Sequence, residues 1–507
     1  MTAVRPPASA GPASAGAASA GPASAGAASA GPADQRDDGL AERLHRLLVG
    51  AGSGAPTLVA ATIEVPVADP IAVYAAAVEA DLEAALWLQP SEGTAYVGIG
   101  RAWAVEPEGP DRFDAAASAW QALISDASID GPPSRYGGGP VLLGGLGFNG
   151  RRPDQADVWG PFGPASLVLP ELLLAVTPNG SSVTGSLFAD AVGPWSAGSL
   201  EHRWERLADR ARSLAPNPAG IIVRPVVAPL VIVAEQPARE AWRRLVGMFA
   251  GAVGRGRLDK VVLARRVDFR ASVELDVPNA VRRLALSAPE STTYAFRREG
   301  RTFIGATPER LVRTEGHDFR TVAVGGSIRR GADAAEDAVL AQALLDSEKN
   351  REEHAIVVAA LEQLLAPVAE RLEVAPGPGV MTLRHIQHLV TEVTGTVREA
   401  HGLLALAGRL HPTPAVGGEP RALALSLIDE HEGFDRGWYA GPVGWLGADG
   451  DGELCVALRC GIVDRTRATL FAGCGIVADS DPDQEWEESR IKLRAVAAAL
   501  GRLEDET

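Results

Sequence analysis

A ten-residue repeat near the start of the chain limits where folding can begin. The residues GPASAGAASA at positions 11–20 recur letter for letter at 21–30. Neither copy contains a large apolar side chain, so the tract cannot bury enough surface to offset the entropy lost on ordering. We therefore expect residues 1–37 to form a disordered tail and residues 38–505 to form a single folded domain.

Beyond the tail, short β-like runs alternate with helical patterns. TLVAATIEV (57–65) and VLLGGLGF (141–148) are typical of strands, whereas FDAAASAWQALI (113–124) and LEHRWERLADRARSL (200–214) are typical of helices. A Pro-punctuated passage at 215–230 indicates either a linker or an edge-strand region.

One segment matches the dinucleotide-binding pattern GxGxxG, at 145–150. That pattern needs a helix directly after it, but Arg-Arg-Pro-Asp follows here. We therefore interpret this segment as a Gly-rich turn between strands.

The charge balance limits the classes of partner. The chain has 48 Lys and Arg against 64 Asp and Glu, a formal net charge of −16. Such a surface repels phosphate backbones and anionic lipids, so we expect neither nucleic acid nor a membrane as partner. An anionic substrate would have to be attracted locally by Arg, Lys or a divalent cation.

Cysteine usage and hydropathy indicate the compartment. Cys455, Cys460 and Cys474 are too few for a disulfide framework and lack the spacing of a zinc site, which favours a reducing environment. The chain has no long, strongly apolar run typical of a transmembrane helix, and its start lacks the apolar core of a signal peptide. We therefore expect a cytoplasmic protein.

Two predicted acidic helices could supply a metal site. One begins at the Asp-Pro pair 481–482, a typical helix start, and its Glu485, Glu488 and Lys492 fall on one face. The other contains EKNREEHAIVVAALEQLL, in which Glu353 lies at the margin of the apolar face. Mg²⁺ prefers one or two carboxylates completed by water and substrate oxygens. A solvated helix face with intrahelical ion pairs would show the same pattern.

Two other residues are candidates for acid–base chemistry. Lys260 opens the apolar run VVLARRVDF, where partial loss of hydration would suit its amine to act as a general base. Glu309 follows a strand pattern and the turn-like GATP, and it could act as a general acid if its pKa is raised. A Lys that faces water and a Glu in the first turn of a helix are the alternatives.

Four more residues could contact a carboxylate. Gly326 and Ser327 lie in a Gly-rich segment whose N–H groups could hold an anion, although a plain hairpin turn fits equally well. Arg459 falls in the alternating strand pattern ELCVALRCGIV, where a single Arg can bind a carboxylate. His388 could donate a hydrogen bond to a ligand or satisfy one in the core.

Taken together, nine segments in order between about 239 and 500 resemble the chorismate-utilising enzymes. These segments are DKVVLARR (259–266), GATPERLV (305–312), AVGGSIRRG (323–331), SEKNREEH (347–354), TLRHIQHLVTEVTG (382–395), HPTPAVGG (411–418), RGWYAGPVGW (436–445), LCVALRC (454–460) and AGCGIVADSDPDQEWEESRIK (472–492). The resemblance implies an α+β fold in which two large, mainly antiparallel β-sheets pack together with helices on the outside. The mixed helix and strand pattern is compatible with that fold.

Two positions make the chain most similar to the isochorismate synthases of this family. Lys260 matches a position that is Lys in relatives using water as nucleophile and Gln in the ammonia-using anthranilate and aminodeoxychorismate synthases. Ala415 matches a position that is Thr in relatives that go on to eliminate pyruvate. The resemblance implies a Mg²⁺-dependent, reversible conversion of chorismate to isochorismate, with water attacking C2 and the C4 hydroxyl leaving. It also implies a monomer without a glutamine amidotransferase subunit, whose product supplies menaquinone, siderophore or salicylate biosynthesis.

The resemblance further implies a role for each candidate residue. Lys260 corresponds to the general base and Glu309 to the general acid. The implied Mg²⁺ ligands are Glu353, Glu485 and Glu488. The implied substrate contacts are Gly326, Ser327, His388, Ala415, Arg459, Gly475 and Lys492.

Three positions depart from the family pattern, and three alternative functions stay open. Asn350 stands where Asp is common, Glu419 where an aromatic residue is common, and Phe471 where Tyr is frequent. The alternatives are a salicylate synthase that eliminates pyruvate, a non-catalytic chorismate-binding homologue, and a structural or interaction protein that acts through the repeat tail.

Overall fold

A computed structural model describes most of the chain. The described residues are 38–50, 57–134, 137–152, 157–188, 196–215, 229–384, 386–398 and 402–503. The predicted tail at 1–37 and most of the passage at 215–230 lie outside the described residues. The described elements belong to one compact unit that begins at Gly39.

The larger sheet has fourteen strands. Its neighbours pair antiparallel except β1 with β5 and β10 with β24. In spatial order, the strands are β24 (Arg502–Leu503), β10 (Pro229–Gln236), β11 (Lys260–Ala271), β23 (Arg467–Ile476), β22 (Cys460–Asp464), β13 (Arg301–Thr307), β12 (Thr292–Arg298), β2 (Ala84–Gln89), β3 (Thr94–Ile99), β8 (Leu172–Thr177), β9 (Gly180–Phe188), β1 (Leu58–Val65) and β5 (Ser128–Asp130), with β19 (Gly418–Glu419) paired to β11.

The smaller sheet has ten strands, all paired antiparallel. In spatial order, they are β16 (Ala369–Val374), β18 (Ile386–Val397), β15 (Asp318–Arg329), β14 (Arg310–Glu315), β21 (Gly452–Val456), β20 (Pro442–Gly447), β6 (Val141–Leu146), β7 (Ala165–Leu169) and β4 (Trp103–Val105), with β17 (Gly379–Thr382) paired to β18.

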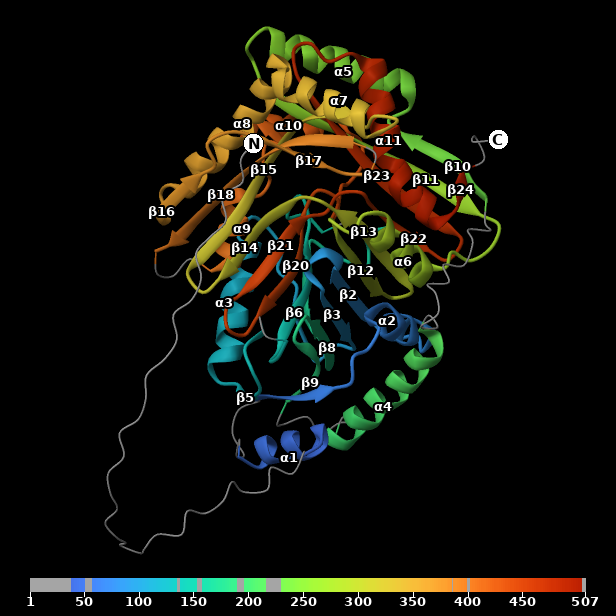
Figure 1. Ribbon diagram of the computed structural model, residues 1–507, viewed down its shortest axis with the longest axis vertical. Helices are drawn as coiled ribbons and strands as arrows, with labels where there is room; N and C mark the ends of the chain where they lie inside the picture. The colour runs from blue at the N-terminus through green and yellow to red at the C-terminus, as the bar shows by residue number, and fades with distance from the viewer. Residues whose placement is uncertain are drawn as a thin grey trace, which may run out of the picture. The chain divides into compact units, whose positions relative to one another are not determined.

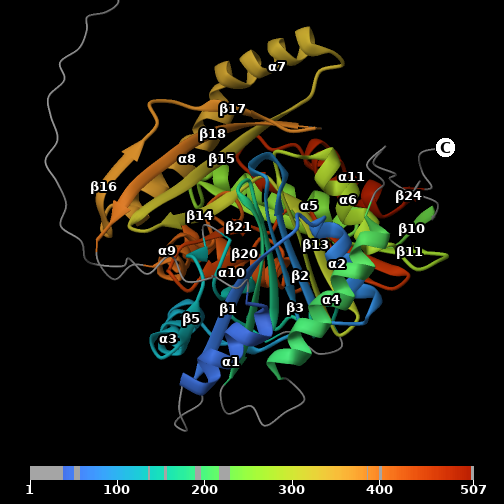
Figure 2. The same cartoon turned by 60° about the horizontal axis from the view of Figure 1, so that its bottom comes forward.

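The helices lie mainly on the outer faces of the sheets. They are α1 (Leu40–Gly50), α2 (Pro70–Glu79), η1 (Pro90–Glu92), α3 (Arg112–Ser125), α4 (Ala197–Leu214), α5 (Arg239–Gly254), α6 (Val277–Ser287), α7 (Ala334–Asp346), α8 (Glu348–Leu365), α9 (Leu403–Leu410), α10 (Arg421–His431) and α11 (Pro482–Leu500). Helix α11 runs beside β23 with α6 next to it (Figure 1). Helix α1 contacts α4 and lies against the strand β1 (Figure 2).

Two apolar cores hold these layers together. Between the sheets, Tyr96 on β3 packs against Trp445 on β20, with ring centroids 4.9 Å apart. The second core joins the larger sheet to α1, α2, α4, α6 and α11. The predicted fold, two mainly antiparallel sheets packed together with helices outside, is therefore confirmed.

Two connections carry the chain from one sheet to the other. Residues 308–309 lead from β13 in the larger sheet to β14 in the smaller one, and residues 457–459 lead from β21 back to β22. The two crossings are hydrogen-bonded side by side, from Val456 N–H to the Glu309 carbonyl at 2.9 Å and from Ala306 N–H to the Arg459 carbonyl at 3.2 Å. They bring two candidate site residues to the seam between the sheets.

Several local predictions can be compared with the structure. The GxGxxG segment starts in β6, and the next regular element among the described residues is the strand β7, so the turn interpretation is confirmed. All three cysteines are free and buried. Among the described residues, no helix has the length and apolar character needed to cross a membrane.

Candidate active site

A cleft of about 80 Å³ lies where the two crossings meet β11, β15, β18 and α11. Its lining includes every candidate residue except Glu485, although these residues come from segments distributed over more than 200 positions. Several residues that the sequence did not single out also line it. They include Val262 and Tyr439, and Tyr439 stacks on Phe471 with ring centroids 5.4 Å apart. The segment RGWYAGPVGW already contained Tyr439, but nothing in its pattern indicated a cleft.

Lys260 is the first residue of β11 and is only 2 % exposed. Its Nζ donates a hydrogen bond to Glu353 Oε1 at 2.8 Å, so the alternative of a Lys facing water is wrong. Gly475 lies on the neighbouring strand, and a Cβ there would come within 2.6 Å of Lys260 Cε. The absence of a side chain at Gly475 therefore gives the Lys260 side chain its space.

Glu309 is buried in the crossing between β13 and β14. Burial raises the pKa of its carboxyl group from 4.5 to about 7, although the charges of Lys260, Arg459 and Lys492 oppose the rise. No helix includes Glu309, so the alternative of a first-turn helical Glu is wrong. A carboxyl group with this pKa still holds its proton through much of the neutral range.

Arg459 does not lie in a strand, which corrects the sequence-based interpretation. It is in the crossing between β21 and β22, with a left-handed φ of +48°. The chain changes sheets here, so the alternation of ELCVALRCGIV belongs to two strands in different sheets. A left-handed non-glycine residue costs about 1 kcal/mol or more, and such residues concentrate at functional sites.

Gly326 and Ser327 do not form a hairpin turn but a bulge inside the long strand β15. Gly326 has a left-handed φ of +68°, and the register against β18 shifts between Gly325 and Ser327. Asn350 on α8 holds this bulge, because its Oδ1 accepts a hydrogen bond from the Ser327 N–H at 3.1 Å. Its Nδ2 also donates to Ser347 Oγ at 2.8 Å, which an Asp at this position could not do.

His388 lies opposite Ser327 on β18. Its Nδ1 is 2.9 Å from Ser327 Oγ and 3.3 Å from the Gly326 carbonyl oxygen. Burial, with the charge of Arg459, lowers the pKa of His388 to about 3, so the ring is neutral. With the proton on Nδ1, the other nitrogen is left as a hydrogen-bond acceptor.

Helix α11 supplies three candidate residues. The Asp481 side chain caps it by accepting from the N–H groups of Asp483 and Gln484, as predicted. Lys492 Nζ donates to Glu488 Oε1 at 2.6 Å and to the Gly473 carbonyl at 2.8 Å. Lys492 is therefore held at the cleft from two sides.

A group of possible metal ligands lies at the start of α11. Ligand atoms of Glu485, Glu488 and Cys474 are all within 4.8 Å of one another. Burial and the neighbouring Glu488 raise the pKa of Glu485 to about 7, which shows that the two carboxylates repel each other. A divalent cation would relieve that repulsion, so the donor set fits Mg²⁺. Burial also raises the pKa of the Cys474 thiol well above its usual range, so Cys474 stays a protonated neighbour.

Glu353, the third candidate metal ligand, lines the same cleft from α8. Its carboxylate is bound by Lys260, and the group of Glu485, Glu488 and Cys474 does not include it. The structure therefore brings two of the three candidate metal ligands together and places the third against the candidate base.

The chain is similar to known proteins over most of its length. A family model described as "Chorismate binding enzyme" matches residues 41–501. The salicylate biosynthesis isochorismate synthase of Pseudomonas aeruginosa is 37% identical over 448 residues, which cover 88% of this chain and 91% of that protein. The isochorismate synthase MenF of Bacillus subtilis is 30% identical over 420 residues, or 82% of this chain and 87% of that protein. Among solved structures, the menaquinone-specific isochorismate synthase of Escherichia coli matches with a TM-score of 0.71 at 25% identity, covering 90% of this chain and 99% of that chain.

Proposed function

Because the chain belongs to the family of chorismate binding enzymes, we propose that it is an isochorismate synthase, an isomerase that converts chorismate to isochorismate. In this reaction water attacks C2 of the ring and the C4 hydroxyl leaves, so the site needs a base, an acid and contacts for two carboxylates. One observation carries the proposal: Lys260 and Glu309 line a single cleft in which burial raises the pKa of Glu309 to about 7.

Glu309 and Lys260 would divide the proton transfers. Glu309 would donate its proton to the departing C4 hydroxyl, which becomes water. Lys260, in its neutral amine form, would accept a proton from the attacking water, and Glu353 holds the Lys260 Nζ in position at 2.8 Å. The space left by Gly475 keeps that amine inside the cleft.

The remaining lining residues would hold the substrate carboxylates. Arg459 and Lys492 supply positive charge and the bulge at Gly326–Ser327 supplies backbone N–H groups, which together counteract the acidic net charge of the chain. Mg²⁺ held by Glu485 and Glu488, together with Glu353 if its carboxylate turns from Lys260, would neutralise one substrate carboxylate. Lys260 in place of Gln favours water over ammonia, so we expect no amidotransferase subunit, and the family resemblance implies a monomer.

Product analysis tests this function. The purified protein is incubated with chorismate, with Mg²⁺ or with EDTA, and the products are separated by chromatography. We expect isochorismate to form with Mg²⁺ only, and the Glu309→Gln variant to form none. Salicylate and pyruvate as main products would assign the chain to the eliminating enzymes despite Ala415. No turnover with tight chorismate binding would favour the non-catalytic homologue.

A further inference from the structure

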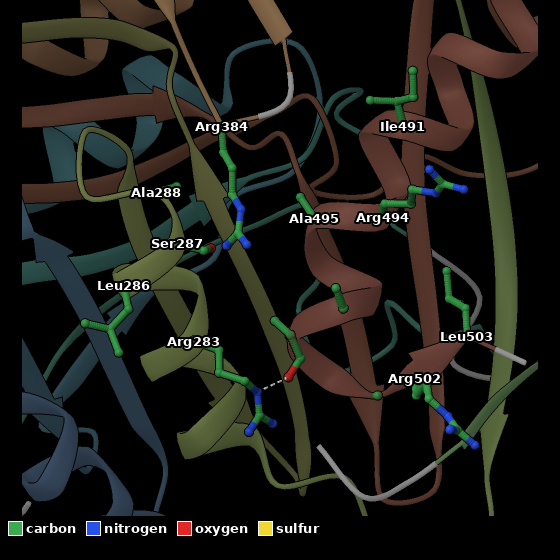
Figure 3. Close-up of a pocket in the computed structure, with 13 residues that line it drawn as sticks. Arg283, Leu286, Ser287, Ala288, Arg384, Ile491, Arg494, Ala495, Arg502 and Leu503 are labelled. Carbon is green, nitrogen blue, oxygen red and sulfur yellow. Dashed lines mark hydrogen bonds between the residues drawn. The ribbon is translucent and has the colours of Figure 1, made fainter. Parts of the chain in front are cut away.

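A groove of about 830 Å³ lies between α6 and α11 and shares no lining residue with the active-site cleft. The last turns of both helices form its walls, and Arg384 reaches it from the connection between β17 and β18 (Figure 3). Neither the reaction nor the fold requires an opening of this size here.

The groove is basic in an acidic protein. Four of the 13 residues that line it are arginines, namely Arg283, Arg384, Arg494 and Arg502, and none of the 13 is acidic. Positive charge collected in this way requires an explanation in a chain with a net charge of −16.

Two of these arginines have exposed side chains without a partner, whereas some other exposed arginines are paired. Arg151 and Arg210, for example, are paired with Asp429 and Glu79. The side chains of Arg384 and Arg502 are exposed but form no hydrogen bond or ion pair within the described part of the chain. Because a guanidinium group offers five N–H donors in a planar fork, they are available to bind an oxyanion.

The rest of the wall is apolar. Leu286 at the end of α6 is 49% exposed. Its side chain lines the groove and would pack against a ligand that filled it. Ile491, Ala495 and Ala498 on α11 line the same space. In Figure 3 the Arg384 guanidinium points into the gap between these two helices, next to Ser287. The groove therefore combines anion-binding groups with an apolar surface.

We propose that this groove is a second ligand site that binds a small organic polyanion, a molecule with two or more phosphate or carboxylate charges on an apolar body. Arginine forks bind the oxyanions and the helix surfaces take the body. The occupant would contact α11, the helix whose earlier turns carry Glu485, Glu488 and Lys492. The proposal concerns a binding site of its own and does not depend on which reaction the cleft performs.

Calorimetric titration of the full chain at low ionic strength tests the proposal. The probes are 1-naphthyl phosphate, benzene-1,3,5-tricarboxylate and inorganic phosphate. The first two compare a phosphate with carboxylates on an aromatic body, and inorganic phosphate shows how an anion binds without an apolar body. We expect one site that binds at least one of the two aromatic anions roughly tenfold more tightly than inorganic phosphate. Arg384→Ala and Arg502→Ala should each weaken that binding roughly five- to tenfold.

Two control variants locate the binding. Arg212→Ala removes an exposed arginine on α4, far along the chain from the groove, and should leave the affinity unchanged. Arg459→Ala alters the catalytic cleft and should also leave it unchanged. Thermal unfolding of each variant checks that it still folds. Because Arg384 and Arg502 are exposed, we expect their substitution to leave the melting temperature unchanged.

Four results would overturn the proposal. The first is that neither aromatic anion binds. The second is that Arg212→Ala weakens binding as much as the groove variants do, and the third is that Arg459→Ala weakens binding while Arg384→Ala does not. The fourth is that binding appears only after Glu504, Asp505 and Glu506 are made neutral. The last result would assign the groove to the acidic residues that follow Leu503 in the chain itself.

Discussion

The carboxyl group of Glu309 is buried, so its negative charge is costly, and this affects stability as well as catalysis. Its pKa is about 7 in the folded chain against an ordinary 4.5, so between these pH values the folded state binds more protons than the unfolded state. The free energy of unfolding therefore falls as pH rises through this window. The full contribution, present below pH 4.5 and lost above pH 7, is about 3 kcal/mol.

Glu309→Gln should therefore separate stability from activity. The amide imitates the protonated carboxyl group, so we expect the variant to be more stable than the parent at about pH 8, by up to about 3 kcal/mol, and similar to it at about pH 4. It should have no measurable turnover at either pH, since it carries no proton to donate. Urea unfolding at the two pH values measures the difference, and equal stability of the two proteins at the higher pH would contradict the buried-carboxyl argument.

Lys260 is the second residue whose loss should stop the reaction. We expect Lys260→Ala to lower kcat/KM by about a thousandfold or more, because general base catalysis contributes 10²–10⁴-fold and the variant also frees Glu353. The measurement is isochorismate formation under saturating Mg²⁺. Arg351→Ala is the control, an exposed basic residue on α8 that does not line the cleft and should leave the rate unchanged. A near-parental rate in Lys260→Ala would contradict the proposed role of Lys260 as the general base.

At the scale of elements, the sequence predicted helices better than it predicted the strands that carry the site. The capped start of α11 and the faces of α11 and α8 followed from local signals around Asp481 and Ser347. On α11, Val496 and Leu500 are buried, whereas Ala495 borders the groove. Helix periodicity depends on neighbours in sequence, which explains this success.

Around the site, the strand pattern was right for Lys260 and Glu309 but placed Arg459 wrongly in a strand. Arg459 and Glu309 lie where a strand leaves one sheet for the other, and Gly326 lies in a bulge. Alternation of apolar and polar residues does not reveal which sheet a strand joins or where its register shifts, because both depend on partners far away in the sequence. Family resemblance brought these residues together, but their backbone conformations came only from the structure.

Gly475 tests whether β23 makes room for the base. A Cβ at this position would lie 2.6 Å from Lys260 Cε and 3.0 Å from Glu353 Oε1. We expect Gly475→Ala to displace the Lys260 amine and lower kcat at least tenfold, with little loss of stability because Lys260 can move. Gly377→Ala is the control, since a Cβ there meets nothing within 4 Å. Unchanged kcat in Gly475→Ala would show that the amine's position is not set by this contact.

Helix α11 allows a matched test of the metal site. Glu488 lines the cleft, whereas Glu487 points outward and pairs with Arg490 on the same helix. We expect Glu488→Gln to weaken Mg²⁺ binding at least tenfold while changing the melting temperature little, and Glu487→Gln to change neither. Calorimetric titration with MgCl₂ measures the affinity. Equal Mg²⁺ affinity in the two variants would show that Glu488 does not bind the metal.

At the scale of the whole molecule, the architecture explains how an acidic chain could hold a dianion. The site is a small cleft at the seam of two large sheets, and its lining combines Arg459, Lys492 and Lys260. Low-dielectric walls strengthen the field of these charges locally, so the net charge of the chain matters less inside the cleft than outside it. This balance depends on both crossings, which composition alone could not reveal.

The boundary between tail and domain provides the last prediction. The repeats at 11–30 contain no large apolar side chain, whereas Leu40 and Leu44 on α1 are completely buried against the larger sheet. We expect deletion of residues 1–37 to leave both kcat/KM and the melting temperature unchanged. Deletion of residues 1–50 also removes α1 and exposes the core under it, so it should cost about 4 kcal/mol of stability, from two buried leucines at about 2 kcal/mol each. Thermal unfolding and turnover of the three lengths measure both effects. Loss of activity in the shorter deletion would give the repeat tail a role in function, and equal stability of the two deletions would mean that α1 does not belong to the folded unit.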